Sequence, residues 1–250
     1  MFTSKKRFDL FELLLISAVS AFVAWSLKPT YILADPAGEM APFRAAYGPD
    51  RNSEGFEEWL IRDFYQDRRD GVFVDVGANH HQQASNTYYL ERSLGWSGIA
   101  VEPLTQFEAG YREHRPRTRF RAFFVSDQSD QRAKIYVGDE TLVTSQTREF
   151  TARWGGQLKE IEAPTITLTA LLTKEGIERI DFLNMDIELA EPKALAGFDI
   201  RRFTPSLVCI EAHPEVRQEI ISYFHTNGYV MVGKYLRADQ RNLYFTPASA

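Results

Sequence analysis

The chain has 250 residues and a formal net charge of −5 at pH 7, with its basic residues scattered. This mild acidity gives no electrostatic support for a nucleic-acid partner, so none is expected. The single cysteine, Cys209, excludes an internal disulfide framework, and its apolar neighbours predict a buried structural thiol. The length that remains after the amino-terminal segment is common for one α/β domain.

Residues 1–28 are predicted to form an N-terminal membrane anchor. The basic cluster Lys5-Lys6-Arg7 precedes a long apolar stretch whose only charge is Glu12. Residues 8–27 are long enough to cross about 30 Å of hydrocarbon as a transmembrane helix, so we expect them to contact a membrane. The alternative is a cleaved signal peptide that ends near Ala34.

Residues 29–52 carry four prolines and little periodicity, which predicts a linker. The folded domain is therefore expected to cover residues 53–250. Its first predicted element is a helix from Glu54 to Gln66, which Ser53 caps and whose apolar side chains share one face.

Two apolar runs then end in polar residues. The run Val72–Val76 predicts a buried strand that carries Asp75 near its end and is followed by Gly77. The next predicted strand, Ile99–Glu102, ends at a glutamate. Parallel strands bring such residues to one edge of the sheet, where α/β proteins bind nucleosides. Glycine lets the backbone turn tightly there, and Glu102 is placed to accept hydrogen bonds from two ribose hydroxyls.

The rest of the chain alternates between predicted strands and helices. Strands are expected at Arg119–Val125, Ala133–Val137, Ile180–Met185, Leu207–Ile210, Tyr229–Val232 and Asn242–Phe245, and helices at Asn86–Leu94, Pro103–His114, Glu191–Ala196 and from Pro214 to Gly228. Residues 139–163 are expected to be irregular, with a lid in which Phe150 and Trp154 pack. This alternation predicts an α/β fold with a doubly wound, mostly parallel sheet and an antiparallel edge.

From Phe56 to Thr246 the chain resembles the FkbM-type methyltransferases, a family that depends on S-adenosylmethionine and has a Rossmann-like sheet of the class I methyltransferase type. The resemblance rests on these segments in this order: Val74-Asp75-Val76-Gly77-Ala78-Asn79, Ser85-Asn86-Thr87, Leu94-Gly95-Trp96-Ser97-Gly98, Val101-Glu102-Pro103, Val125-Ser126-Asp127, Asp181-Phe182-Leu183-Asn184-Met185-Asp186-Ile187-Glu188 and Ile210-Glu211-Ala212-His213. It implies S-adenosylmethionine as the cofactor.

The resemblance also implies which residues bind this cofactor. Asp75, Gly77 and Asn79 would surround its methionine moiety. Glu102 would hold the ribose hydroxyls, and Asp127 would lie beside the adenine amino group.

Three further residues acquire catalytic roles from the same resemblance. Asp186, after the predicted strand Ile180–Met185, would face the sulfonium and the acceptor. Glu211 and His213 would lie near the incoming hydroxyl, where a neutral histidine is able to remove a proton as the methyl group transfers. The remainder of catalysis would be the alignment of nucleophile, methyl group and sulfur.

The chain departs from the family pattern at two places. His80-His81 stands where family members commonly have a glycine, and Leu189 replaces a glycine of the motif that begins at Asp186. Each change is expected either to reshape the pocket or to abolish activity. No metal is expected, and the adjacent histidines, which point in different directions, make a poor metal pair. The alternative is a divalent cation bound by Asp186, Glu188 and Glu191, but Glu191 also suits a helix amino end.

The leading functional hypothesis is a membrane-anchored O-methyltransferase that acts on a hydroxyl of a sugar, glycolipid or related small molecule. A second hypothesis is a catalytically inactive protein that uses this fold for protein or glycan binding. A third, a nucleotide-sugar enzyme, is disfavoured because no G-x-G-x-x-G loop follows the first strand.

The expected location is a membrane crossed once. The positive-inside rule assigns Lys5-Lys6-Arg7 to the cytoplasm and the large domain to the other side. The supply of S-adenosylmethionine instead favours a cytoplasmic domain. The sequence leaves both orientations open.

Overall fold

The structure is a computed structural model that describes residues 36–139 and 144–248. These residues belong to one compact unit, Pro36–Ala250. The predicted anchor, residues 1–28, lies outside the described residues. Within the described ranges, no helix combines the length and the apolar character needed to cross a membrane.

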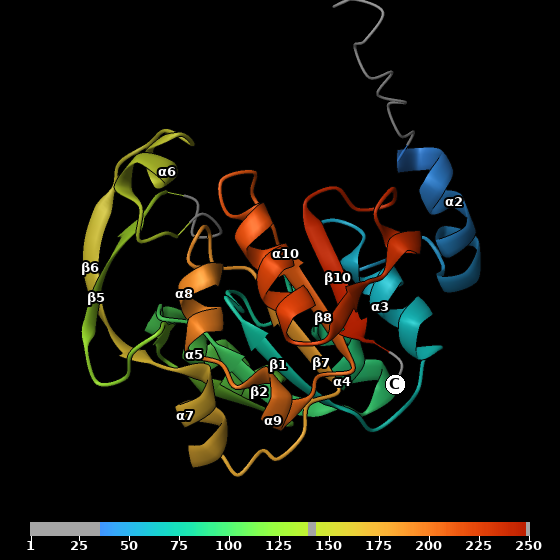
Figure 1. Ribbon diagram of the computed structural model, residues 1–250, viewed down its shortest axis with the longest axis horizontal. Helices are drawn as coiled ribbons and strands as arrows, with labels where there is room; N and C mark the ends of the chain where they lie inside the picture. Colours follow the sequence, from blue (N-terminus) through green and yellow to red (C-terminus); the bar gives the residue numbers. More distant parts are fainter. Residues whose placement is uncertain (1–35, 140–143, 249–250) are drawn as a thin grey trace, which may run out of the picture. The chain divides into compact units, whose positions relative to one another are not determined.

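A seven-stranded sheet forms the centre of this unit, with the strand order β3-β2-β1-β7-β8-β10-β9 (Figure 1). Its strands are β1 (Val72–Val76), β2 (Ser97–Val101), β3 (Thr118–Arg121), β7 (Phe182–Met185), β8 (Leu207–Glu211), β9 (Tyr229–Met231) and β10 (Asn242–Pro247). The pairs from β3 to β8 are parallel, and β10 is antiparallel to both β8 and β9. The prediction of a mostly parallel sheet with an antiparallel edge is confirmed.

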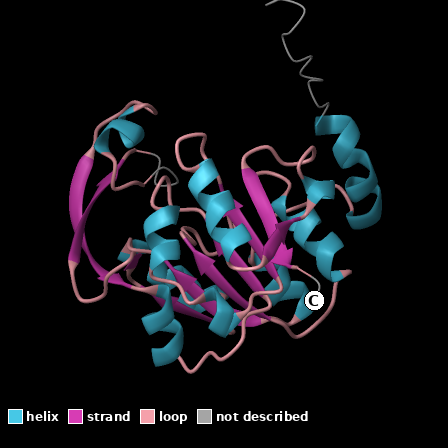
Figure 2. Cartoon of the chain, in the orientation of Figure 1, coloured by secondary structure: helices cyan, strands magenta, loops and turns pink. Residues whose placement is uncertain are grey.

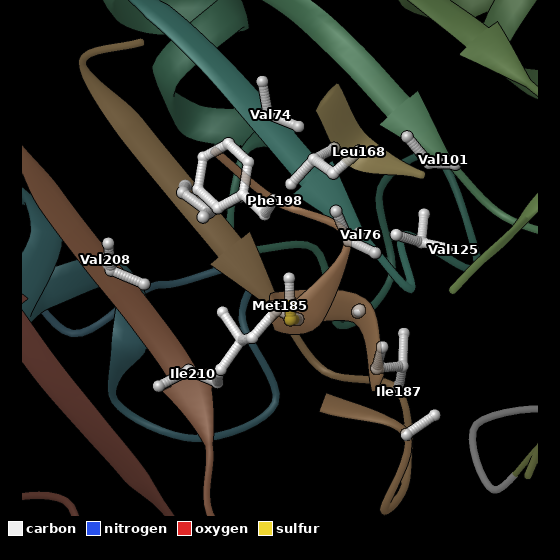
Figure 3. Packing of buried hydrophobic residues seen from close by; sticks show 14 of the residues in the cluster. Val74, Val76, Val101, Val125, Leu168, Met185, Ile187, Phe198, Val208 and Ile210 are labelled. Atoms are coloured by element: carbon white, nitrogen blue, oxygen red, sulfur yellow. The ribbon is translucent and has the colours of Figure 1, made fainter. Parts of the chain in front are cut away.

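Helices cover both faces of the sheet because successive side chains of a strand point to opposite faces. On β1, Val74 and Val76 belong to a core cluster with α7 (Leu168–Lys174), α8 (Glu191–Ala196), α9 (Ile200–Phe203) and α10 (Arg217–Thr226). Figure 3 shows Leu168 and Phe198 beside Val74 in this cluster. Phe73, the residue before Val74, belongs to the opposite cluster with α2 (Pro36–Tyr47), α3 (Glu57–Tyr65) and α4 (Tyr88–Leu94). The sheet is therefore doubly wound, as predicted, and Figure 2 shows its helices on both sides.

The range predicted as a linker contains a helix, α2. Met40 of this helix is buried, and the ring of Phe43 lies 6.2 Å from that of Tyr235. Tertiary contacts therefore hold a helix that Pro42 disfavours by itself. The predicted buried thiol of Cys209 is confirmed, since its side chain is fully buried in the same core cluster.

A second, three-stranded sheet has the order β4-β6-β5, with β4 at Phe124–Val125, β5 at Arg132–Val137 and β6 at Lys159–Ile166. The predicted continuous strand Arg119–Val125 is wrong. The chain turns after β3, where the Phe123 N–H donates to the Arg121 carbonyl at 3.1 Å, and β4 joins the second sheet.

The expectation of an irregular segment at 139–163 is wrong for the range of β6. Apolar Ile161 and Ala163 alternate there with charged residues, as in a strand with one buried face. Cross-strand ion pairs accompany this strand: Lys134 Nζ lies 2.8 Å from Glu160 Oε1 on the partner strand. The same segment also contains an unpredicted helix, α6 (Arg148–Ala152), which Figure 1 shows beside β5 and β6.

Candidate functional site

A cavity of about 520 Å³ opens where β1, β2, β7 and β8 end. Its volume is within the usual range for small-molecule sites. About half of its lining comes from the ends of these strands and the segments after them, at 75–79, 102–103, 184, 186–188 and 211–214. The other lining residues are at 54, 57, 84–86, 123–125, 144, 154, 217 and 240–241. This is the edge of an α/β sheet at which ligands bind.

Seven of the eight predicted site residues line this cavity: Asp75, Gly77, Asn79, Glu102, Asp186, Glu211 and His213. The eighth, Asp127, follows β4, is exposed and is not among the lining residues. Its Oδ1 accepts a hydrogen bond from the Ser126 hydroxyl at 3.0 Å. At this place the lining instead consists of Phe123, Phe124 and Val125.

Asp75 is buried and joins three elements. Its Oδ2 accepts a hydrogen bond from the Thr87 hydroxyl, before α4, at 2.7 Å. Its Oδ1 accepts one from Asn184 Nδ2 at 2.8 Å, across the parallel pairing of β1 with β7. Burial raises the pKa of Asp75, although both hydrogen bonds act in the opposite direction. Both carboxylate oxygens of Asp75 therefore already accept hydrogen bonds, and these bonds hold β1, β7 and the start of α4 together beside the cavity.

Gly77 takes a left-handed backbone conformation with φ of +83°. A Cβ built at this position would lie 1.8 Å from the Asp186 carbonyl oxygen, which no side chain tolerates. Glycine is needed here because the turn after β1 touches the end of β7. This close contact holds the ends of β1 and β7 together. The tight turn at Gly77 is the one that the sequence predicted.

Glu102 is buried at the end of β2, and its carboxylate organises the backbone around it. Oε1 accepts a hydrogen bond from the Leu104 N–H at 2.9 Å, and Oε2 accepts one from the Asn79 N–H at 3.2 Å. Burial, with a smaller contribution from the charge of Asp75, raises the pKa of Glu102 to about 7. A carboxylate has about four acceptor positions, so Glu102 retains capacity for further donors.

Three side chains meet at the far part of the cavity. His213 Nε2 lies 3.1 Å from Glu188 Oε2 and 2.9 Å from Glu211 Oε2. The Glu188 contact, followed by the Glu211 contact, raises the pKa of His213 to about 10. The ring is thus protonated at neutral pH, which differs from the neutral base that the resemblance implied. Phe150 packs against this ring edge to face, with centroids 4.9 Å apart.

The pKa values of two neighbouring carboxyl groups, Asp186 and Glu211, shift in opposite directions. Burial and the charges of Glu211 and Glu188 raise the pKa of Asp186 well above its usual range. Burial acts on Glu211 in the same sense, but its contacts with His213 outweigh burial and leave its pKa below the usual value. Asp186 therefore holds its proton more tightly than an ordinary aspartate, and Glu211 loses its proton more readily than an ordinary glutamate.

The two departures from the family pattern lie outside the cavity lining. The His80 and His81 rings contact each other in a tilted arrangement with centroids 4.1 Å apart, and His81 stacks on His114 with centroids 4.7 Å apart. Leu189 keeps a left-handed backbone, with φ of +77°, so the chain retains the path that a glycine would take. Neither change fills the cavity.

Two residues of the site, Asn184 and Trp154, were not predicted from the sequence. Asn184, which links Asp75 to Asn86, is a polar residue within an apolar strand, and this pattern was the available signal. Trp154 was expected to pack, but 66% of its surface is exposed and it lines the cavity. Phe150 is buried, as expected.

The family model described as the methyltransferase FkbM domain matches residues 75–231. Among curated proteins, no sequence matches this chain.

Solved structures that resemble the chain include a TehB-like SAM-dependent methyltransferase from Corynebacterium glutamicum, with 13% identity over 86% of this chain and 97% of that one and a TM-score of 0.46. A methyltransferase from Geobacter sulfurreducens shares 14% identity over 92% and 97%, with a TM-score of 0.41. An O-methyltransferase from Bacillus cereus shares 13% over 93% and 97%, with a TM-score of 0.40. Identities this low concern the fold alone.

Proposed function

This chain belongs to the methyltransferase FkbM domain family, with S-adenosylmethionine as its cofactor, and from that premise we propose that it methylates a hydroxyl of a sugar, glycolipid or related small molecule. The observation that carries the proposal is the cavity at the strand ends, where Glu102 and the carboxylate cluster around His213 lie on one surface. Glu102 suits the ribose hydroxyls of a nucleoside, and the carboxylates around His213 suit a hydroxyl group that donates a hydrogen bond.

The residues of the cavity fit the cofactor. Glu102 has acceptor capacity for the ribose hydroxyls, and the backbone from Gly77 to Asn79 turns beside it. Asp75, at the end of β1 before this turn, is held by hydrogen bonds from Thr87 and Asn184. Phe123, Phe124 and Val125 offer an apolar wall on which a base would lie.

When bound, the cofactor supplies an electrophilic methyl group: the acceptor oxygen bonds to the methyl carbon, and the carbon–sulfur electron pair stays on sulfur. The residues of the chain have to hold the acceptor oxygen in line and receive its proton. Glu188 and Glu211 face the cavity as hydrogen-bond acceptors for that hydroxyl. His213 holds these two carboxylates in place, in contrast to its implied role as a neutral base.

A sugar-like acceptor is favoured by what surrounds this cluster. Trp154 presents an exposed indole at the cavity, and carboxylates lie on the same surface. Pyranose rings have apolar C–H faces that pack on aromatic rings, while their hydroxyls donate to carboxylates. Both kinds of contact are available here.

Calorimetric binding of S-adenosylhomocysteine to the full-length chain tests the proposal. We expect Glu102→Gln to weaken binding about tenfold to 100-fold, because it removes charge-assisted hydrogen bonds to the ribose. Because the pKa of Glu102 is about 7, affinity for the wild-type protein should rise between pH 6 and 8, and this rise should disappear in the variant.

Glu108→Gln, a change at an exposed position of α5 (Glu108–His114), serves as the control and should leave binding unchanged. Failure of the folded wild-type protein to bind either S-adenosylmethionine or S-adenosylhomocysteine would sink the proposal. Transfer of labelled methyl to monosaccharides or to an extracted glycolipid fraction would remove the non-catalytic alternative.

We also propose that residues 8–27 anchor the enzyme in a membrane, which would bring it to lipid-linked acceptors. The apolar length and the preceding basic cluster support this location. The full-length chain should sediment with membranes after a carbonate wash, whereas a variant without residues 1–28 should not. Release of both by carbonate would contradict an anchor.

A further inference from the structure

The cluster of Glu188, Glu211 and His213 has the composition and spacing of a cation site. One ligand atom from each side chain lies within 4.8 Å of the other two. The three come from the loop after β7 and the end of β8, and all line the cavity. We propose that these side chains bind a divalent cation. Binding of the cation stands on this geometry, and only its role rests on the proposed methyl transfer.

The hydrogen bonds of the cluster are incomplete. His213 Nε2 faces an oxygen of each glutamate, but one N–H points to one acceptor at a time, and Glu188 Oε2 has the hydrogen-bond geometry. Glu211 Oε2 is buried in a side chain that is only 7% exposed and lines the cavity, and no N–H points to it although His213 Nε2 lies 2.9 Å away. The other group that hydrogen-bonds the Glu211 side chain is the Asp186 carboxyl. A buried carboxylate oxygen without a donor is costly, and a cation at this point would satisfy it.

Further carboxyl groups surround the cluster at this end of the sheet. Asp186 and Glu191 lie close enough to influence the two glutamates electrostatically. Glu191 is fully buried, and its Oε2 also has no hydrogen-bond donor. The nearby guanidinium of Arg241 is paired with Glu54 at 3.2 Å. Carboxyl groups therefore gather at this point, as the binding of a divalent cation requires.

The donor set indicates the kind of cation. Two carboxylates and one imidazole suit Mn²⁺, Zn²⁺ and, with more water, Mg²⁺. Three protein ligands leave coordination positions open towards the cavity. An acceptor hydroxyl bound there would be acidified and oriented, in the way that metal-bound water is. The same side chains form an ion cluster without the cation. Binding of the cation would release the proton of His213 Nε2 to solvent, and the neutral imidazole and the two carboxylates would then act as ligands.

Binding of Mn²⁺ to the full-length chain, followed by electron paramagnetic resonance, tests this site. We expect one bound Mn²⁺ per chain, displaced by Mg²⁺ or Zn²⁺, with a ¹⁴N coupling from an imidazole. His213→Gln should remove the coupling. Glu211→Gln should weaken binding about 100-fold, because loss of a ligand exceeds the usual effect of losing its supporting contacts.

Glu215→Gln is the matched control, since Glu215 lies two residues from His213 but pairs with Arg153 at the surface. It should bind Mn²⁺ as the wild type does. Absence of bound Mn²⁺, bound Mn²⁺ without ¹⁴N coupling in the wild type, or equal binding by all variants would overturn the site. The coupling is read in the wild type, so this result stands even when a variant misfolds.

Binding of S-adenosylhomocysteine by the same samples separates this inference from the proposed function. If Glu211→Gln still binds S-adenosylhomocysteine, its loss of Mn²⁺ comes from the missing ligand and not from misfolding of the cavity. A wild type that binds Mn²⁺ with ¹⁴N coupling but no S-adenosylhomocysteine would refute the methyltransferase proposal and leave the cation site in place.

Discussion

Glu188 and Leu189 form a strained pair beside the cavity. Both have positive φ, +55° and +77°, in a loop between β7 and α8. Non-glycine residues pay about 1–2 kcal/mol in this region of backbone space. Strain of this kind persists only where the surroundings enforce it. Here it turns the Glu188 side chain to His213, so the cluster depends on the backbone path as well as on residue type.

We predict that Leu189→Gly stabilises the protein by about 1 kcal/mol, since relief of the left-handed strain exceeds the added flexibility of the unfolded chain. Leu189 belongs to no core cluster of the described residues, so little packing is lost. Urea denaturation measures the change. Ala190→Gly, where φ is −93°, is the control and should destabilise. A Leu189→Gly variant that is equally destabilised would show that the leucine side chain, and not its backbone, matters.

At the scale of elements, the β5–α6–β6 arm completes the site. The Ser145 hydroxyl donates to the Glu188 carbonyl at 2.6 Å, and Phe150 packs on His213. These contacts connect the second sheet to the carboxylate cluster of the first. Trp154, just after α6, is then left exposed at the cavity. The arm therefore supplies an aromatic surface to a site that the main sheet makes polar.

We predict that Trp154→Ala raises the KM for a sugar acceptor about tenfold and leaves the affinity for S-adenosylhomocysteine unchanged, because the indole faces the acceptor side of the cavity. Trp154→Phe should retain most of the activity. Steady-state kinetics with labelled S-adenosylmethionine gives both values. Thermal stability should hardly change, since the side chain is mostly exposed. Unchanged kinetics in Trp154→Ala would exclude the indole from acceptor binding.

At the scale of the whole molecule, acidic side chains gather at one edge of the main sheet. Burial raises the pKa of both Glu102 and Glu191 to about 7, and that of Asp186 well above its usual range. Each group holds its proton more tightly in the folded than in the unfolded protein. Their contribution to stability is therefore fully present below about pH 4.5 and is lost as the pH rises towards 7 and beyond.

We predict that the melting temperature falls between pH 5 and 8. Glu191→Gln should reduce this slope and raise the free energy of unfolding at pH 8 by about 2 kcal/mol, because a neutral amide keeps the acceptor for the Ile187 N–H. Glu162→Gln, at an exposed position of β6, is the control. Calorimetry across this pH range measures both. A melting temperature that rises towards pH 8 would contradict the prediction.

Much of the site was predictable because it follows from local patterns. Apolar runs that end in Asp75, Glu102 and Glu211 predict buried strands with polar ends, and topology brings parallel strand ends to one edge. The reason for Gly77 was only partly visible, since its close neighbour is the Asp186 carbonyl, far away in the sequence. The α2 helix was missed because its stability comes from contacts with distant side chains.

The sequence by itself determined the parallel strands of the main sheet, the polar residues at their ends and the family, since hydrophobic periodicity and short motifs are local features of the chain. Only the tertiary structure decided that His213 lies between Glu188 and Glu211, that Trp154 faces the cavity and that β4 leaves the main sheet. Charge state, exposure and strand pairing depend on which distant residues come together, and packing of the whole domain fixes that choice.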